Sequence, residues 1–73
     1  MYIHEAIAET RRERPAGVFI RRAGWPYNKM HRTGYMIRPT SAPGGCVAYS
    51  FDLPAEKWVP TADDLTADDW EVC

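Results

Sequence analysis

The amino-acid sequence predicts an α+β fold, in which an N-terminal helix packs on a small and mainly antiparallel sheet. Three observations predict it: apolar residues at helical spacing near the N-terminus, short segments rich in β-branched and aromatic residues, and Pro/Gly-rich breaks between them. The chain has 73 residues, 45% of them hydrophobic, which suffices for one domain over residues 1–73. A domain this small buries only ~60% of the surface of its unfolded chain, so we expect it to self-associate.

The predicted helix extends from Ile3 to Glu13. Its apolar face is formed by residues at positions i, i+3, i+4 and i+7, namely Ile3, Ala6, Ile7 and Thr10. Acidic residues come early in this segment and arginines come late, which suits the helix dipole. Pro15 and Gly17 then end the helix.

Three segments have the composition of β-strands, namely residues 18–22, 34–38 and 46–51. Residues 24–28 and 39–45 lie between them and predict loops, because they are rich in turn-forming residues such as Gly and Pro. We expect the first loop to expose two aromatic side chains, Trp25 and Tyr27.

The C-terminal segment contains two signals of a helix start. Thr61 precedes Asp64 by three residues, and Thr66 precedes Asp69 in the same way, as in a capping box. Together they predict a short helical turn followed by a corner. Residues 70–72 can then close the sheet as an edge strand.

The net charge of −1 conceals a strong separation of charge. Residues 11–38 contain eight basic residues and one acid, whereas residues 50–73 contain seven acids and one lysine. The two halves can attract each other as solvated faces, within one chain or between subunits. Alternatively, the basic half faces a ligand that carries phosphate. The sequence alone leaves both interpretations open.

No pattern in the sequence is typical of catalysis or of a metal site, so we expect a protein that is not an enzyme and has no cofactor. His4 and His31 each stand alone, without the spacing of metal ligands. Ser41 and Ser50 lack a nucleophile-elbow motif. The clustered acids of the C-terminal segment stand where helix caps are expected.

The compartment is expected to be the cytoplasm. No segment approaches ~20 consecutive apolar residues, and the first residues lack the apolar centre of a signal peptide. We therefore expect no membrane contact, and we expect Cys46 and Cys73 to be reduced thiols. A disulfide between them is the alternative.

One basic and aromatic segment has the composition of a nucleotide-binding site. It holds, within eleven residues, Arg22, Trp25, Tyr27, Asn28, Lys29 and Arg32. Guanidinium groups bind phosphates in a bidentate manner, and aromatic faces stack on bases for ~1–3 kcal/mol. An Asn amide can bind a base edge or a ribose hydroxyl. The alternative is that Trp25 is a core residue and that the basic side chains are only solvated.

Two stretches of the chain resemble the second Thoeris anti-defence protein family. Residues 20–25, IRRAGW, look like its Arg-x-Gly-Trp signature, and residues 58–72, WVPTADDLTADDWEV, are similar to its C-terminal block. Residues 5–7 also match its first helix. The C-terminal block is the more specific of these similarities.

The resemblance implies a phage protein that acts in the cytoplasm of the infected bacterium. Members of the family assemble as homotetramers and sequester cyclic ADP-ribose isomers made by TIR-domain defence proteins, which they release unchanged. Some members also bind cyclic oligonucleotide signals of the CBASS system at a separate site. Residue by residue, Trp25 falls where the signal-binding loop begins, and Trp58 and Asp64 fall in the block that helps line the pocket.

The chain departs from the family pattern in its middle. Pro26 and Tyr27 stand where the family commonly has Asn-Gly, and the asparagine comes later, as Asn28. Residues 31–57 are also shorter than is common. These differences bear on which signal is bound and on how the pocket rim is built.

We therefore predict a ligand-binding site and no catalytic or metal site. Its candidate residues are Arg22, Trp25, Tyr27, Asn28, Trp58 and Asp64. The expected ligand is a cyclic nucleotide, the expected assembly is a homotetramer, and no DNA partner is expected. The alternative function is a small module that binds single-stranded nucleic acid or acts in regulation. A purely structural oligomer would bind no nucleotide.

Overall fold

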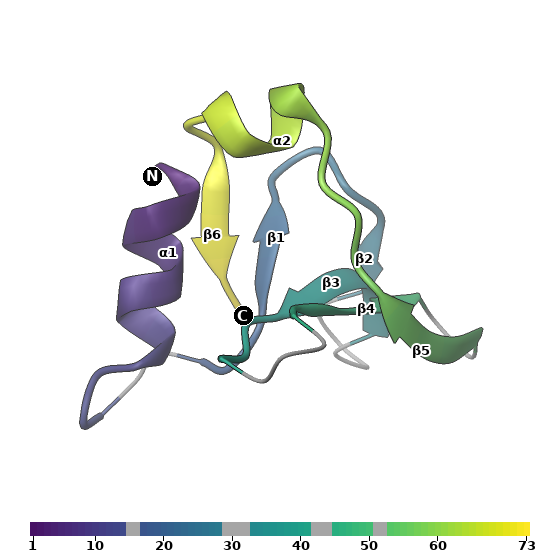
Figure 1. The fold of residues 1–73 in the computed structure, drawn as a ribbon, viewed down its shortest axis with the longest axis horizontal. Helices are drawn as coiled ribbons and strands as arrows, with labels where there is room; N and C mark the ends of the chain where they lie inside the picture. The colour runs from purple at the N-terminus through teal and green to yellow at the C-terminus, as the bar shows by residue number, and fades with distance from the viewer. Residues whose placement is uncertain (15–16, 29–32, 42–44, 51–52) are drawn as a thin grey trace.

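The structure is a computed structural model, and it describes residues 1–14, 17–28, 33–41, 45–50 and 53–73 (Figure 1). The elements in these residues are α1 (Ile3–Thr10), β1 (Ile20–Arg22), β2 (Tyr27–Asn28), β3 (Thr33–Arg38), β4 (Val47–Ser50), β5 (Leu53–Lys57), α2 (Ala62–Thr66) and β6 (Trp70–Val72). The predicted α+β fold, with an N-terminal helix and a mainly antiparallel sheet, is confirmed. Among the described elements, no helix is long and apolar enough to cross a membrane.

The sheet has the strand order β5-β4-β3-β1-β6, and β2 pairs with β3 outside this path. Each described strand pair is antiparallel. Ile37 of β3 lies opposite Ile20 of β1 on one side and opposite Ala48 of β4 on the other. These three side chains therefore share one face of the sheet. Figure 1 shows α1 beside β6 and β1, and α2 across the end of these two strands.

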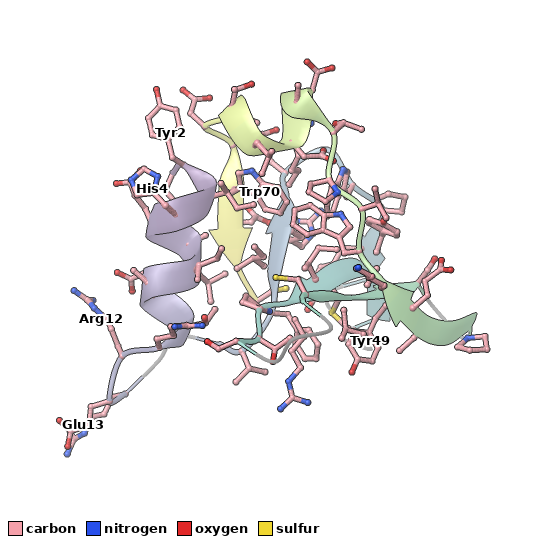
Figure 2. All side chains as sticks on the ribbon, viewed as in Figure 1. Tyr2, His4, Arg12, Glu13, Tyr49 and Trp70 are labelled. Atoms are coloured by element: carbon pink, nitrogen blue, oxygen red, sulfur yellow. The ribbon has the colours of Figure 1, made fainter. Side chains whose placement is uncertain are left out.

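The core lies on this face, between the sheet and the two helices. Its buried apolar side chains are Ile3, Ala6, Ile20, Ile37, Ala48, Trp58 and Trp70. Trp70 is the largest fully buried side chain among the described residues, with 1% of its surface exposed. Its indole nitrogen donates a hydrogen bond to the backbone oxygen of Asp64 at 2.8 Å. Figure 2 shows Trp70 pointing into the space enclosed by the helices and strands.

Helix α1 ends at Thr10, three residues before the predicted end at Glu13. The Thr10 hydroxyl donates to the Ile7 carbonyl oxygen at 2.7 Å, and Arg11 leaves the helical conformation with φ −99° and ψ 0°. Residues 11–14 are all exposed. Because no apolar side chain in this segment can be buried, nothing there favours another helical turn.

The first strand begins at Ile20 instead of Val18, which is 51% exposed. Phe19 nevertheless pairs with Cys73 through two backbone hydrogen bonds of 3.2 and 2.8 Å. Gly17 packs directly on the same residue, since a Cβ atom there would lie 2.7 Å from the Cys73 carbonyl carbon. The other two predicted strands match β3 and β4 to within one residue at each end.

Two strands were not expected from the sequence. β2 covers two residues within the segment predicted as a loop, and β5 contains Pro54, which is unfavourable in a strand interior. β5 lies at the edge of the sheet. Pro54 has no N–H to donate, and an edge strand tolerates this because one of its sides forms no hydrogen bonds to another strand. It forms because β4 offers a free edge, and the register shifts between Ala48 and Ser50.

Helix α2 begins at the predicted cap. The Thr61 hydroxyl accepts from the Asp64 amide at 3.2 Å, and the Asp64 carboxylate accepts from the Thr61 amide at 3.0 Å. The prediction of a second cap at Thr66 is wrong: Thr66 is the last residue of α2, and its hydroxyl donates to the Ala62 carbonyl oxygen. The chain turns at Ala67, so the predicted corner and the edge strand after it are confirmed.

Truncation of the central ring is expected to unfold the protein. Trp70→Ala removes a side chain with 1% exposure, and such changes cost ~3–5 kcal/mol of unfolding free energy. A domain of this length has about 4–11 kcal/mol in total. Urea denaturation followed by circular dichroism measures the loss. Val18→Ala, at a position that is 51% exposed, is the control and should stay within about 0.5 kcal/mol of the parent. Equal midpoints for the two variants would contradict this account of the core.

Candidate functional site

Four aromatic rings meet on the core face of the sheet, and we name them the tryptophan cluster: Trp25, Tyr35, Trp58 and Trp70. Trp70 lies in the middle, with ring centroids 5.1 Å from Trp25 and 5.8 Å from Trp58. Tyr35 meets Trp25 from the other side at 4.7 Å. The rings meet edge to face, with interplanar angles of 78–82°. Such contacts stabilise by about 0.5–1.5 kcal/mol each beyond their burial.

The cluster is assembled from segments far apart in the sequence. The Trp25 amide donates to the Arg22 carbonyl oxygen at 3.0 Å, which fixes a tight turn after β1. The Trp58 amide donates to the Cys46 carbonyl oxygen at 3.0 Å and ties the end of β5 to the start of β4. Backbone hydrogen bonds at these positions therefore set where the rings stand.

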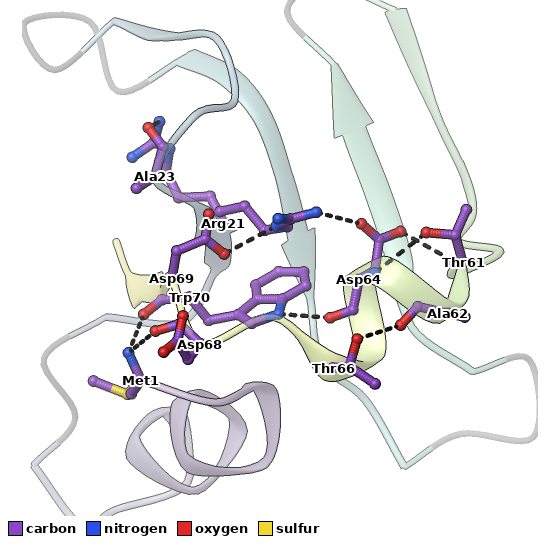
Figure 3. Close-up of polar contacts among 11 residues, drawn as sticks. Met1, Arg21, Ala23, Thr61, Ala62, Asp64, Thr66, Asp68, Asp69 and Trp70 are labelled. Atoms are coloured by element: carbon purple, nitrogen blue, oxygen red, sulfur yellow. Dashed lines mark hydrogen bonds and ion pairs between the residues drawn. The ribbon is translucent and has the colours of Figure 1, made fainter.

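An ion-pair network borders the tryptophan cluster. The Arg22 Nε lies 3.0 Å from Asp69 Oδ1, and its Nη1 lies 3.4 Å from Asp64 Oδ1. The hydrogen bond that Arg22 donates to Asp69, with a smaller contribution from Asp64, raises the pKa of the Arg22 guanidinium above its ordinary value. Asp64 also caps α2 and binds the Trp70 indole through its backbone oxygen (Figure 3).

The surroundings of the cluster are partly dry and acidic. Burial raises the pKa of the Tyr35 phenol above its ordinary value, and the nearby charges of Asp64 and Glu56 act in the same direction. The phenol is therefore neutral at physiological pH and can donate a hydrogen bond. In the free protein the charge of Arg22 is already matched by carboxylates, so the described residues of the site carry no surplus of positive charge.

Arg21 holds the loop that carries Trp25. Its side chain is buried, with 6% exposure, and forms an ion pair with Glu71. Its Nη2 donates to the backbone oxygens of Trp25 at 2.5 Å and of Ala23 at 3.3 Å. The guanidinium carbon lies 4.9 Å from the centroid of the Tyr27 ring, within range of a cation–π interaction. Arg21 thus fastens residues 23–27 to β1 and β6.

Comparison with known proteins decides the family. A family model described as Tad2-like, a Thoeris anti-defense 2-like domain, matches residues 1–73. The chain belongs to the Tad2-like family. It is thus a Thoeris anti-defence domain, and the match includes the middle of the chain, where the sequence departs from the common pattern. No curated protein and no solved structure matches the chain.

Four of the predicted site residues of this Tad2-like domain lie together. Trp25 and Trp58 belong to the tryptophan cluster, and Arg22 and Asp64 form part of its charged border. The structure does not bring the other two to this place: Tyr27 packs under Arg21, and Asn28 is exposed at the end of β2. Lys29, His31 and Arg32 lie outside the described residues.

The expected exposure of Trp25 and Tyr27 is wrong. Both side chains are half-buried, Trp25 because Tyr35 and Trp70 cover two of its sides. Trp58 is also buried, with 9% exposure. The interpretation of Trp25 as a core residue was therefore correct in part, because its side chain is only partly buried.

Tyr35, Asp69 and Arg21 were not predicted from the sequence as residues of the site. Asp69 had the spacing of a helix cap, and only the fold shows that it binds Arg22 instead. In the described parts of the chain, no group of His, Cys, Asp and Glu side chains could hold a metal ion. Cys46 and Cys73 are free thiols, as predicted.

A glycine in β3 sets the position of the loop, and its substitution is expected to disturb the cluster. A Cβ atom at Gly34, whose φ is +155°, would lie 2.6 Å from Tyr27 Cα and closer still to the Pro26 oxygen. Gly34→Ala should therefore cost about 1–3 kcal/mol and change the near-ultraviolet circular dichroism of the tryptophans. Gly24→Ala is the matched control, because nothing lies within 4 Å of the added atom. If both variants have the parent spectrum and stability, β2 does not position Trp25.

Proposed function

We propose that this Tad2-like domain is a sponge for cyclic ADP-ribose isomers made by TIR-domain defence proteins. It binds the signal in the cytoplasm of the infected bacterium, holds it unchanged and so blocks Thoeris signalling. The observation that carries the proposal is the convergence of Arg22, Trp25, Trp58 and Asp64 around Trp70. Aromatic, cationic and acidic groups thus occur together at this place in a Thoeris anti-defence domain.

The chemistry of the ligand fits these groups. A cyclic ADP-ribose isomer has a purine, two riboses and two phosphates. The partly buried ring of Trp25 can stack on the purine. A carboxylate such as Asp64 can accept from ribose hydroxyls, and Arg22 can bind a phosphate through two of its N–H groups. Each of these contacts uses a residue whose position the fold already fixes.

Binding requires that Arg22 exchange partners. The Asp69 side chain is 39% exposed, whereas that of Asp64 is 14% exposed and also serves the cap of α2. We infer that the phosphate replaces Asp69 and leaves the contact with Asp64 in place. The free protein thereby keeps Arg22 ordered and neutralised until the signal arrives.

Sequestration needs no catalytic group. An enzyme must bind the transition state more tightly than the substrate, whereas a sponge needs only tight binding of the signal itself. To compete with the receptor, the dissociation constant should be nanomolar or lower, which corresponds to about −12 kcal/mol. Stacking and charge-assisted hydrogen bonds are suited to such uniform binding.

A second copy of the chain completes the site in this proposal, within a homotetramer built as a dimer of dimers. Val59 and Leu65 are 78% and 53% exposed, and they directly follow Trp58 and Asp64 in the chain. Exposed apolar side chains beside a ligand site favour contact with a second protein chain. Such an interface would supply both a second wall for the pocket and the buried surface that a small core lacks.

Native mass spectrometry tests binding, assembly and the absence of turnover together. The protein is mixed with a panel of cyclic ADP-ribose isomers, with cyclic oligonucleotides and with single-stranded oligonucleotides. We expect four chains carrying a cyclic ADP-ribose isomer of unchanged mass, which heating returns intact and active on a receptor. A hydrolysed product that grows with time would contradict sequestration, and a ligand-bound monomer would contradict the shared site. Preference for single strands, lost steeply with salt, would favour the nucleic-acid alternative.

A pair of neighbouring acids tests the role of Arg22. Asp69→Asn removes the exposed partner of Arg22, and we expect it to tighten binding of the cyclic ADP-ribose isomer by about tenfold, because the phosphate no longer competes with a carboxylate. Asp68→Asn is the matched control, since it removes the same charge from an adjacent exposed residue; screening should limit its effect to about twofold. Isothermal titration calorimetry measures both. Equal affinities for the two variants would show that Arg22 does not contact the ligand.

A further inference from the structure

A cavity of about 470 Å³ lies on the side of the sheet opposite the tryptophan cluster, over β3, β4 and β5. In the register of these strands, Arg38 lies opposite Val47, and Val47 lies opposite Lys57. The three side chains therefore share one face, and they alternate with the core residues Ile37 and Ala48 on the other. Figure 2 shows the labelled Tyr49 and Trp70 on opposite sides of the β3–β4 ribbon.

The two basic side chains of the cavity are not used by the fold. Neither Arg38 nor Lys57 forms an ion pair with any residue in the described parts of the chain. Arg21 and Arg22 differ in this respect, because each is matched by a carboxylate. Glu56 also lines the cavity, but it lies opposite the core residue Ala48 in the register, and its charge acts on Tyr35 of the core face. The cavity thus keeps a net positive charge that is free to act on a ligand.

The rest of the lining is suited to a planar group. Tyr49 and Val47 provide an aromatic ring and an apolar side chain. Phe19 meets the Tyr49 ring edge-on at 5.4 Å, with an interplanar angle of 87°, and so restricts its movement. A volume of 470 Å³ is within the ~300–1,000 Å³ range of sites for small molecules. It is too small for a macromolecule.

We propose that this cavity binds a small aromatic anion, with its ring against Tyr49 and Val47 and its phosphate or carboxylate group between Arg38 and Lys57. Charge selects the anion, since both cations lack a partner in the described structure. Shape selects the ring, since the supported tyrosine and the valine form an apolar surface beside the charges. This site is separate from the tryptophan cluster, and it does not rest on the sponge function.

The test is a ¹H–¹⁵N NMR titration of the full chain with four probes: adenosine 5′-monophosphate, benzoate, adenosine and inorganic phosphate. We expect adenosine 5′-monophosphate, benzoate or both to shift the amide signals of Thr40, Gly45 and Val47, which line the cavity. Adenosine and inorganic phosphate should bind at least tenfold more weakly, because each offers only one of the two parts. The comparison of adenosine 5′-monophosphate with benzoate tells a phosphate ligand from a carboxylate ligand.

Charge variants supply the control. Arg38→Gln and Lys57→Gln should each weaken binding of the better probe at least fivefold while the spectrum stays folded. Arg14→Gln removes the same charge from an exposed residue outside the cavity and should leave the affinity unchanged. Cavity amides that do not shift at millimolar probe, or equal affinity in all three variants, would overturn the proposal. The three indole N–H signals report separately on the tryptophan cluster, so failure of one site is distinguishable from failure of the other.

Discussion

The Trp70 indole donates its N–H to the backbone oxygen of Asp64 and packs between Trp25 and Trp58, and most of the remaining structure depends on this arrangement. One side chain from the edge strand thereby joins the capped helix α2, the loop after β1 and the segment after β5. Few side chains in the described residues are fully buried, and that of Trp70 is the largest of them. An unpaired indole N–H in this core would be costly, so the short helix that presents the Asp64 oxygen is as necessary as the ring.

Part of the separated charge along the sequence is paired within the fold itself. Arg22 binds Asp64 and Asp69, and Arg21 binds Glu71, so two basic residues of β1 meet three acids of the C-terminal segment. Of the two interpretations that the sequence left open, attraction between the halves within one chain therefore holds at these positions. A phosphate that binds at Arg22 meets a guanidinium that already has two carboxylate partners, and it must exchange with one of them. Such exchange favours an anion that brings other contacts with it, such as a stacked purine.

The elements with strong local signals were predictable. The apolar spacing around Ile3 and Ala6 identified α1, and Thr61 with Asp64 identified the start of α2. β5 was missed because its residues have little β-propensity and it forms only on the free edge of β4, a cause that lies outside the segment. The end of α1 was overestimated because charge pattern alone cannot show that residues 11–14 bury nothing.

The site was predictable only as a set of residues. The sequence grouped Arg22 and Trp25 by their closeness in the chain, and the family resemblance added Trp58 and Asp64. It could not show that Trp25 turns inward onto Trp70, since that depends on contacts between distant segments. For the same reason it placed Tyr27 with Trp25, whereas the buried Arg21 holds Tyr27 elsewhere.

The central claim is that the tryptophan cluster and its charged border hold a cyclic nucleotide signal. A crystal structure of the protein with a cyclic ADP-ribose isomer tests it most directly. The account predicts a purine stacked on Trp25, a phosphate bound by Arg22 in the place of the Asp69 carboxylate, and a second copy of the chain covering the ligand beside Val59 and Leu65. A ligand bound elsewhere, with the contact between Arg22 and Asp69 unchanged, would contradict it.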